Sequence, residues 1–281
     1  VASFNRPHRA YRVVPKDQPL KQIIDFVRAR EHESGIIYCA SRAATERVAE
    51  SLSSRGFAAR AYHAGLTGDE RSGNQENFLR DDTRIICATI AFGMGINKPN
   101  VRWIIHHDLP KNIEGYYQET GRAGRDGQPA EAWMSYGLAD VVQRRRMIDE
   151  GGAPEEIKRI ERGKLDSLLA LCETAGCRRQ AILAHFGEAH PGGCGNCDTC
   201  LNPVETWDGT SAAITALAAI YRTGQRFGAG HVVDVLLGKA TEKVVRFGHD
   251  QQPVFGAGKE LDARGWQSVL RQLSASGLIE I

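Results

Sequence analysis

The sequence predicts an α/β fold, in which a parallel sheet flanked by helices is followed by two smaller domains. From Arg9 to about Gly137, short β-branched or aromatic runs alternate with longer helical stretches, a pattern typical of parallel sheets. After Gly151–Pro154 the strand pattern stops, and a Leu-rich stretch, a Gly- and Cys-rich segment and further helical stretches follow. We therefore expect a sheet domain, a helical cysteine-containing domain and a winged-helix domain, at residues 1–150, 151–206 and 207–281.

The elements of the first domain follow from residue type and spacing. Runs of β-branched and aromatic residues predict strands, at Tyr11–Val14, Gly35–Cys39, Ala58–Tyr62, Arg84–Ala88, Arg102–His106 and Glu131–Tyr136. Between them, several stretches with apolar residues at helical spacing predict helices, at about Leu20–Arg30, Ala43–Ser54, Gly68–Arg80 and Ile113–Gly121.

The second half of the chain is predicted to be mainly helical. Apolar residues at helical spacing predict a helix over Pro154–Thr174, and four more follow at about Ser211–Thr223, Gly230–Leu237, Thr241–Phe247 and Ala263–Ser276. Pro253–Gly258 has the composition of a hairpin-like wing, and Leu278–Ile281 could form a closing strand. Three helices, a short wing and a fourth helix suggest a winged-helix module.

Composition is ordinary for a globular protein with a sizeable core, with 42% hydrophobic and 25% charged residues in a chain of 281. The formal charge of +2 neither requires nor excludes a polyanionic partner. No apolar run approaches the length of a membrane span, and the N-terminus has neither Met nor a signal-peptide pattern. We expect a piece of a longer protein without a membrane partner.

Four cysteines have the spacing of a metal site. Cys177 is followed by Cys194, Cys197 and Cys200, the last three as C-x-x-C-x-x-C, and four thiolates match tetrahedral structural Zn²⁺. An iron–sulfur cluster or a reactive dithiol is the alternative. Cys172 competes for the fourth position but fits better as a buried thiol in the Leu-rich helix. Seven cysteines, an odd number, favour a reducing compartment over a disulfide framework.

The run QETGRAGRDG, from Gln118 to Gly127, places Arg122 and Arg125 among glycines just after a predicted helix. Guanidinium groups on such a turn suit the charge that develops on a transferring phosphoryl group. The chain contains no G-x-x-x-x-G-K-[ST] loop and no Asp-Glu pair ending a strand. We therefore interpret the run as half of a nucleotide-hydrolysis site, with a surface ion-pair cluster as the alternative. Asp126 is expected to orient a neighbouring arginine.

A second glycine-containing loop, with Gly93 and Gly95, follows the predicted strand that ends near Thr89. Glycines beyond the carboxyl end of a strand let the backbone approach a phosphate. Alone, the loop could be a simple turn. Together with the arginine-containing run, which we expect at the same edge of the sheet, it indicates a nucleotide site.

Four runs of the sequence resemble the second RecA-like lobe of superfamily 2 helicases, specifically the RecQ family. They are GIIYCASRAATERV, AYHAGL, ATIAFGMGINKPNVRWIIHHDLP and YYQETGRAGRDG. The resemblance continues through the cysteine cluster and into the RFG and FGHD runs of the winged helix, so it covers essentially the whole chain. It implies an ATP-dependent DNA helicase that moves 3′ to 5′ on single-stranded DNA in recombination and repair. The first RecA-like lobe would lie elsewhere in the full-length protein.

The resemblance also implies roles for individual residues. Arg125 resembles the arginine finger, with Arg122 beside it on the phosphates, and ATP with Mg²⁺ would further involve Gln118, Gly121, Gly95 and Asn97. The single-stranded DNA track would comprise Ser41, Arg42, His63, Thr89, Phe92, Gly93 and Met94. Ser41 could equally be a helix N-cap, and His63 and Thr89 could be packing residues at strand ends.

In the winged helix, the resemblance implies that Lys243, Arg246 and His249 bind duplex or forked DNA. Eight basic and eight acidic side chains lie between residues 204 and 281, so a basic face there requires spatial segregation of charge. The alternative is a non-catalytic DNA-binding module or regulator. We further expect a cytoplasmic, nucleoid-associated monomer that could also bind a single-stranded DNA-binding protein.

Overall fold

The computed structural model describes residues 3–89, 92 and 96–280. By contact, the chain divides into two compact units. One, the sheet unit, comprises residues 1–140 and 174–204, and the other, the helical unit, comprises 141–173 and 205–281. The three domain boundaries expected from sequence remain a prediction.

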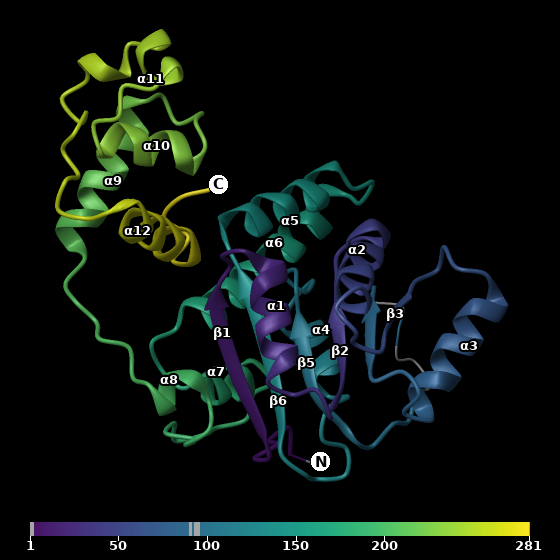
Figure 1. The fold of residues 1–281 in the computed structure, drawn as a ribbon. Helices are drawn as coiled ribbons and strands as arrows, with labels where there is room; N and C mark the ends of the chain where they lie inside the picture. Colours follow the sequence, from purple (N-terminus) through teal and green to yellow (C-terminus); the bar gives the residue numbers. More distant parts are fainter. Residues whose placement is uncertain (1–2, 90–91, 93–95, 281) are drawn as a thin grey trace. The chain divides into compact units, whose positions relative to one another are not determined.

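A parallel sheet forms the centre of the sheet unit (Figure 1), which confirms the predicted fold class. Its strands, in the order β1-β6-β5-β2-β4-β3, pair in parallel throughout the described residues. Their bounds are Arg9–Pro15 (β1), Ser34–Tyr38 (β2), Ala59–Tyr62 (β3), Ile85–Ala88 (β4), Val101–His106 (β5) and Ala130–Tyr136 (β6). All six lie at the predicted positions within a few residues.

Side chains that alternate along the strands build two separate cores. Ile37 and Ile105 face a cluster made with α1 (Pro19–Arg28) and α2 (Arg42–Ser53). Ile36 and Ile104 face the opposite cluster, which contains Phe78 of α3 (Gly68–Leu79). The loop from β5 leads into α4 (Ile113–Thr120), whose N-terminus is capped by the Asn112 side chain, which accepts from Gly115 N at 2.8 Å. Because the strands are parallel, their carboxyl ends share one edge, where α2 begins.

Residues 174–204, called the cysteine segment below, cover the edge strand β1. The segment contains α7 (Arg178–His185) and α8 (Asp198–Leu201). Tyr11 and Cys197 form an isolated parallel bridge, and the Asp198 carboxylate accepts from Val13 N at 2.9 Å. Arg178 Nε donates to the same carboxylate at 2.5 Å. The segment thus satisfies part of the exposed edge of β1.

The helical unit consists of helices around a core that includes Leu168, Leu236 and the fully buried Trp266. Helices α6, α9 and α10 contact α12. None of the described helices is both long and apolar enough to cross a bilayer. The bounds of its elements are α5 (Leu138–Glu150, which begins in the sheet unit), α6 (Glu155–Glu173), α9 (Thr210–Arg222), α10 (Ala229–Leu236), α11 (Glu242–Arg246), a 3₁₀ turn η1 (His249–Gln251) and α12 (Ala263–Ala275).

Two predicted strand features of the winged helix are wrong. Pro253–Gly258 forms turns instead of a hairpin, and residues 278–280 are not a strand. Gly256 N and Gly258 N donate to Val235 O and Leu236 O at the end of α10, both at 2.9 Å. The free carbonyls of a helix end attract donors, and here they take the N–H groups that a hairpin ladder would need. Helix α5 was not predicted from the sequence.

Candidate functional site

The arginine turn, residues 121–127, lies at the amino end of β5. Gly124 N donates to Val101 O at 2.9 Å. Gly124 has φ +64°, and an added Cβ would lie 2.8 Å from both Gln128 O and the His8 ring. Only glycine suits this position, because both the left-handed backbone and the space exclude a side chain. The turn is therefore held in one conformation against the sheet.

The expectation that the arginine turn and the glycine loop share the carboxyl edge of the sheet is wrong for the turn. Helix α4 follows β5 and returns the chain to the amino end of the sheet before the turn begins. The two segments still meet, because Arg125 Nη1 donates to Ile96 O at 2.7 Å. Ile96 ends the glycine loop, whose Gly93, Met94 and Gly95 lie outside the described residues.

The charged side chains of the turn differ in exposure. Arg125 is exposed and Arg122 is half-buried. Among the other residues predicted to bind ATP, Gln118 and Asn97 are exposed and Gly121 is half-buried. Asp126 accepts from Arg102 Nη2 at 2.7 and 2.6 Å, which confirms that it binds a neighbouring arginine. This pairing lowers the pKa of Asp126. Arg125 is thus exposed to solvent, whereas Arg122 is only partly exposed.

A buried contact between a histidine and a glutamate lies near the C-terminal end of α4. Glu119 Oε2 is 2.7 Å from His106 Nε2, and both side chains are almost fully buried. The His106 ring also packs on Tyr38, at a centroid distance of 5.5 Å. Burial raises the pKa of Tyr38, and the nearby Arg122 acts against that rise. The conformation of Glu119, and with it the start of the turn, is set by contacts that the sequence pattern did not reveal.

The predicted DNA-track residues Ser41, Arg42, His63 and Thr89 lie beyond strand ends at the carboxyl edge. Ser41 Oγ accepts from Ala44 N at 3.1 Å, so Ser41 is the N-cap of α2. Arg42 is exposed and lies over Gly65, where an added Cβ would be 3.2 Å from Arg42 Nη1. A backbone N–H cluster at a helix start with an exposed arginine is suited to a phosphate.

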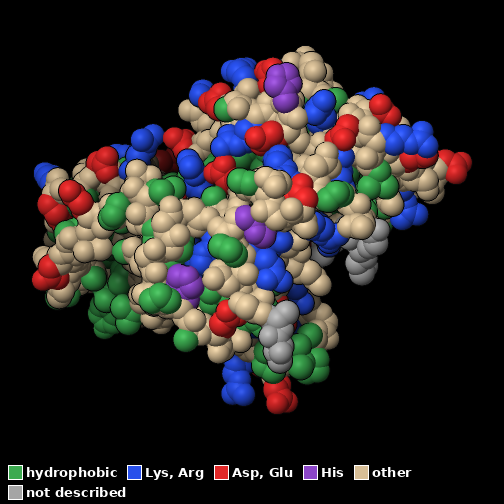
Figure 2. Space-filling view, turned by 90° about the horizontal axis from the view of Figure 1, so that it is seen from below, with side chains coloured by type: hydrophobic (Ala, Val, Ile, Leu, Met, Phe, Trp, Pro, Cys, Tyr) green, Lys and Arg blue, Asp and Glu red, His purple; other side chains and the backbone are tan. Residues whose placement is uncertain are grey.

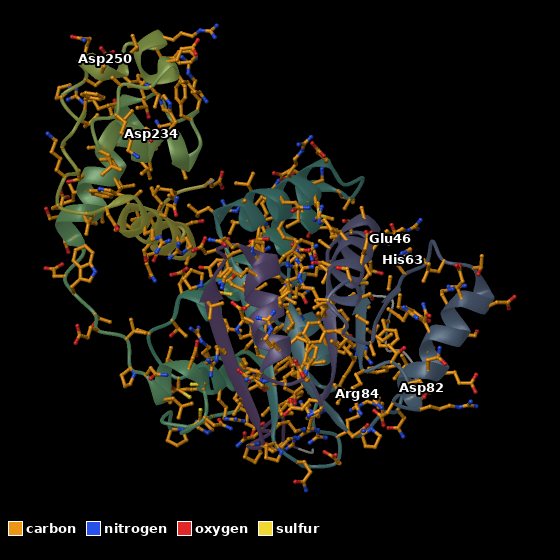
Figure 3. The ribbon with its side chains drawn as sticks, in the orientation of Figure 1. Glu46, His63, Asp82, Arg84, Asp234 and Asp250 are labelled. Atoms are coloured by element: carbon orange, nitrogen blue, oxygen red, sulfur yellow. The ribbon has the colours of Figure 1, made fainter. Side chains whose placement is uncertain are left out.

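His63, by contrast, is a packing residue in this structure. Its Nδ1 accepts from Gly65 N at 3.2 Å, and its Nε2 lies 3.0 Å from Glu46 Oε1 on α2 (Figure 3). The His63 side chain is only 3% exposed. Thr89 is half-buried, with its N–H directed to Tyr62 O at 3.3 Å. Of the four, only Ser41 and Arg42 are exposed.

Phe92 lies in the core, which excludes its side chain from a surface contact with DNA here. It is 0% exposed and packs edge-on against Tyr62 and Phe78, at centroid distances of 4.6 and 5.8 Å. Its carbonyl accepts from Tyr38 Oη at 3.3 Å. The sequence around it is dominated by small residues, so the burial of the ring could not be read from periodicity.

The four predicted metal ligands come together. The Sγ atoms of Cys177, Cys194, Cys197 and Cys200 all lie within 4.8 Å of one another. Cys177 and Cys197 are the N-cap residues of α7 and α8, so helix starts position two of the thiols. Cys172 is buried in α6 and is not part of the cluster. Four thiols in one site with no other ligand match a closed structural zinc site.

Electrostatics within the cluster also favour a cation. Burial opposes ionisation of Cys197, yet hydrogen bonds with Thr199, Arg178 N and Cys200 lower its pKa to about 6. Burial, and hydrogen bonding to Cys197 and Cys177, raise the pKa of Cys200. Neighbouring thiolates repel one another, so a bound cation would favour ionisation of all four.

In the helical unit, aromatic rings and cations form a surface that we call the basic aromatic patch: Arg226, Phe227, Lys243, Arg246 and Phe247. The Phe227 and Phe247 rings meet edge-on, at a centroid distance of 4.9 Å. Arg226 and Lys243 lie 5.5 and 5.4 Å from the Phe227 centroid, and Arg246 lies 5.8 Å from that of Phe247. The cations are exposed, so the patch offers positive charge beside ring faces, as in many nucleic-acid sites.

His249 packs against both rings of this patch, at centroid distances of 4.8 Å from Phe227 and 6.0 Å from Phe247. It is buried, and its Nδ1 lies 2.7 Å from His231 Nε2. Burial lowers the pKa of both imidazoles, and the neighbouring cations, Arg226 for His249 and Lys243 for His231, act in the same direction. The predicted contact residues Lys243 and Arg246 are therefore exposed, while His249 is held inside. Arg226, Phe227 and Phe247 were missed, although the repeated Arg-Phe-Gly at 226–228 and 246–248 marks them in the sequence.

No large region of a single charge dominates the face seen in Figure 2, where Lys and Arg side chains are interspersed with Asp and Glu. This fits 36 basic against 34 acidic residues in the chain. Positive character suited to a polyanion is thus local, at the patch, at Arg42 and at the arginine turn.

Three family models match the chain in succession. They are the helicase conserved C-terminal domain at residues 16–127, RecQ zinc-binding at 138–201 and the RQC domain at 203–281. The zinc-binding match and the four-cysteine cluster together support a structural zinc site.

Relatives match over the full chain. "ATP-dependent DNA helicase RecQ" of Pasteurella multocida is 46% identical over 281 residues, covering 100% of this chain and 44% of that protein. The Haemophilus influenzae protein of the same name is 45% identical over 281 residues, covering 100% and 45%. "ATP-dependent DNA helicase Q-like 4B" of Arabidopsis thaliana is 38% identical over 298 residues, covering 99% and 26%. The chain spans less than half the length of each of these relatives.

Among solved structures, a DEAD box protein from the hyperthermophile Methanococcus jannaschii matches with a TM-score of 0.42 and 25% identity. The match covers 50% of this chain and 38% of that one.

Proposed function

Since the chain belongs to the RecQ helicase family, as its C-terminal helicase, zinc-binding and RQC region, we propose that the intact protein is an ATP-dependent DNA helicase. The names of the relatives support this proposal. We extend it to 3′ to 5′ movement on single-stranded DNA and to a role in recombination and repair.

One observation carries the proposal within this chain. Arg122 and Arg125 stand on a turn whose backbone is fixed to β5 through Gly124, and the exposed Arg125 is held by Ile96 O. The chain has no phosphate-binding loop of its own. We infer that this lobe contributes arginines to ATP and Mg²⁺ held by another lobe. There the guanidinium of Arg125 would stabilise the charge of the transition state.

The other surfaces have roles in the same proposal. Ser41, Arg42 and the backbone at the start of α2 would bind the phosphates of the single strand, and the basic aromatic patch would bind duplex or forked DNA. Phosphate contacts of this kind make binding depend steeply on salt. The zinc site would stabilise the cysteine segment on β1. A monomeric, cytoplasmic protein that also meets a single-stranded DNA-binding protein remains our expectation.

Replacing Arg125 in the full-length protein tests the proposal. Arg125→Ala should lower DNA-stimulated ATP hydrolysis by at least about 10³-fold, since an arginine finger acts on the transition state. ATP and DNA affinities, measured by equilibrium titration, should change little. The control is Arg28→Ala, which removes an exposed arginine at the end of α1. Wild-type hydrolysis by Arg125→Ala would reassign Arg125 to a structural role.

A further inference from the structure

Arg9, the first residue of β1, holds the backbone of the arginine turn. Its side chain crosses to a part of the chain more than a hundred residues away, where Nε donates to Ala123 O at 2.9 Å and Nη2 to Gly121 O at 3.0 Å. These two carbonyls flank Arg122 on either side. A planar guanidinium that binds both at once fixes the peptide plane before Arg122 and the one after Ala123, and so restrains the backbone on both sides of Arg122.

The position of Arg9 is itself set by the cysteine segment. Arg179 Nη2 and Asn196 Nδ2 both donate to Arg9 O, at 2.6 and 3.1 Å. Arg179 lies two residues after Cys177, and Asn196 lies between Cys194 and Cys197. Arg179 therefore lies in the first turn of α7, which follows Cys177, and Asn196 lies in the loop between Cys194 and Cys197.

The same two side chains bind the residues that lead into β1. Arg179 Nη1 donates to Arg6 O at 2.6 Å and to Asn5 Oδ1 at 2.9 Å, and Asn196 Nδ2 donates to Pro7 O at 2.7 Å. Arg179 Nη2 also donates to Asn196 Oδ1 at 2.8 Å, which joins the two donors. The result is a continuous set of hydrogen bonds from the cysteine loops through residues 5–9 to the arginine turn.

Aromatic packing follows the same route. Phe4 stacks on Phe186 at the end of α7, with a centroid distance of 4.6 Å, and meets Tyr117 of α4 edge-on at 5.7 Å. Tyr117 Oη donates to Phe4 O at 2.7 Å. The N-terminal residues are thus held between the helix that follows Cys177 and the helix that precedes the arginine turn.

This arrangement buries two arginine side chains, which opposes folding. Arg9 is 4% and Arg179 is 3% exposed, and the acceptors recorded for both among the described residues are carbonyl and amide oxygens. Burial lowers the pKa of Arg9, because desolvation disfavours the charged form. Burying an uncompensated cation opposes folding, whereas a fork of donors aimed at two carbonyls gives a defined geometry.

We propose that Arg9 is a positioning residue for Arg122 and Arg125, and that Arg179 and Asn196 transmit the position of the cysteine segment to it. The zinc-binding segment then acts on ATP hydrolysis through the arginine turn, in addition to stabilising its own fold. The inference rests on the proposed function, because it takes the turn to act on ATP.

Arg9→Lys in the full-length protein is the first test. Lysine keeps the charge but cannot bind both carbonyls in one plane, so kcat for DNA-stimulated ATP hydrolysis should fall by about tenfold to a hundredfold, as for other small misplacements of reacting groups. KM for ATP should change less than about twofold, because the loss falls on the transition state. Arg145→Lys is the matched control, since Arg145 is also largely buried and pairs with Asp166 in the helical unit.

A double-mutant cycle separates positioning from general destabilisation. Arg179→Lys should lower kcat at full zinc content, and the Arg9→Lys/Arg179→Lys protein should lose little more than the larger single loss, because both act through one set of contacts. Hydrogen exchange of residues 118–127 should speed up in both variants and after removal of zinc by a chelator. If the Arg9 variant does not fold, Asn196→Ala, which removes only one donor to Arg9 O, should give the same effects to a smaller degree.

Three results would overturn the proposal: unchanged kcat in Arg9→Lys or, where that protein does not fold, in Asn196→Ala; strictly additive losses; or an equal loss in Arg145→Lys. Its failure is distinct from failure of the proposed function. An inactive Arg125→Ala with a fully active Arg9→Lys rejects only the positioning role, whereas a fully active Arg125→Ala rejects the role of the turn in hydrolysis.

Discussion

Asp108, at the carboxyl end of β5, joins three segments of the sheet unit. Its carboxylate accepts from Ala40 N at 2.8 Å and from Lys16 Nζ at 3.1 Å. Lys16 also donates to Asp140 at 2.6 Å. Burial would raise the pKa of Asp108, but His107, Ala40 N and Lys16 together lower it. A carboxyl whose folded pKa is lowered stabilises the fold above its ordinary pKa of about 3.9, and this stability is lost as the pH falls through the folded value.

Asp108→Asn should therefore have an effect that depends on pH. At pH 7 the variant should lose about 1–3 kcal/mol of unfolding free energy, the range for hydrogen bonds to charged groups. The difference from wild type should shrink as the pH falls below about 4, where the wild-type carboxylate also becomes protonated. Urea denaturation at a series of pH values measures it, with the exposed Asp82→Asn as control. A difference that stays constant down to pH 3 would show that ionisation of Asp108 is not its source.

At the scale of elements, the cysteine segment depends on its metal and on β1. Its helices are short, at eight and four residues, and short helices contribute little stability alone. Thr199 Oγ1 donates to Gly176 O at 2.7 Å, and Asp198 bridges Val13 N and Arg178. These polar contacts orient the segment, and metal binding would supply most of its folding free energy.

Cys197→Ser should lower zinc content and thermal stability together. A structural zinc site of this kind contributes on the order of 10 kcal/mol of binding free energy, so loss of one ligand should unfold the segment from β1. Zinc per chain by atomic absorption and thermal unfolding by calorimetry provide the measurements. Cys172→Ala is the control, because this buried thiol in α6 lies outside the cluster and should leave zinc content unchanged. A stable, zinc-free Cys197→Ser protein would contradict the structural role.

The basic aromatic patch forms because two separate elements lie together. Its residues come from the loop before α10 and from α11 with the residue that follows it, and each of these segments contains or leads into an Arg-Phe-Gly run. Gly248 has φ +67° and ends the second run, so the chain can reverse towards His249. Although the unit has no excess of basic residues, this folding places three cations around two rings.

At the scale of the whole molecule, we propose that the described chain provides one side of a nucleotide site and two DNA surfaces. It lacks the sequence of a phosphate-binding loop, and its relatives are more than twice as long. DNA binding and ATP hydrolysis are therefore predicted to separate when this part is studied by itself.

The isolated chain should bind forked DNA without hydrolysing ATP. Fluorescence anisotropy should show affinity that falls by at least about tenfold between 50 and 200 mM salt, since several phosphate contacts release counterions. DNA-stimulated ATPase activity should be absent. Sustained turnover by the isolated chain would contradict the division of the site between two lobes.

At the scale of the whole protein, sequence upstream of this chain distinguishes a motor from a non-catalytic regulator. Coding sequence upstream of Val1 that contains a phosphate-binding loop and an Asp-Glu pair would support the motor, and upstream sequence without them would support the regulator. Arg125→Ala then tests the motor directly.

The sequence by itself determined the features that depend on neighbouring residues. Strand runs such as Ile85–Ala88, the cap at Ser41, the four metal-ligand cysteines and the glycine-rich arginine turn all follow from local residue type and spacing. Local backbone and ligand geometry have short range, so a single sequence records them directly.

Only the tertiary structure decided which of these features meet. It placed the arginine turn at the amino end of β5, buried Phe92, His63 and His249, and replaced the expected wing by turns packed on α10. It also joined Arg179 to Arg9, and Arg9 to Gly121, across 170 and 112 positions of sequence. Such contacts depend on how helices return the chain across a sheet and on which polar groups remain to be satisfied, and neither leaves a periodic trace in the sequence.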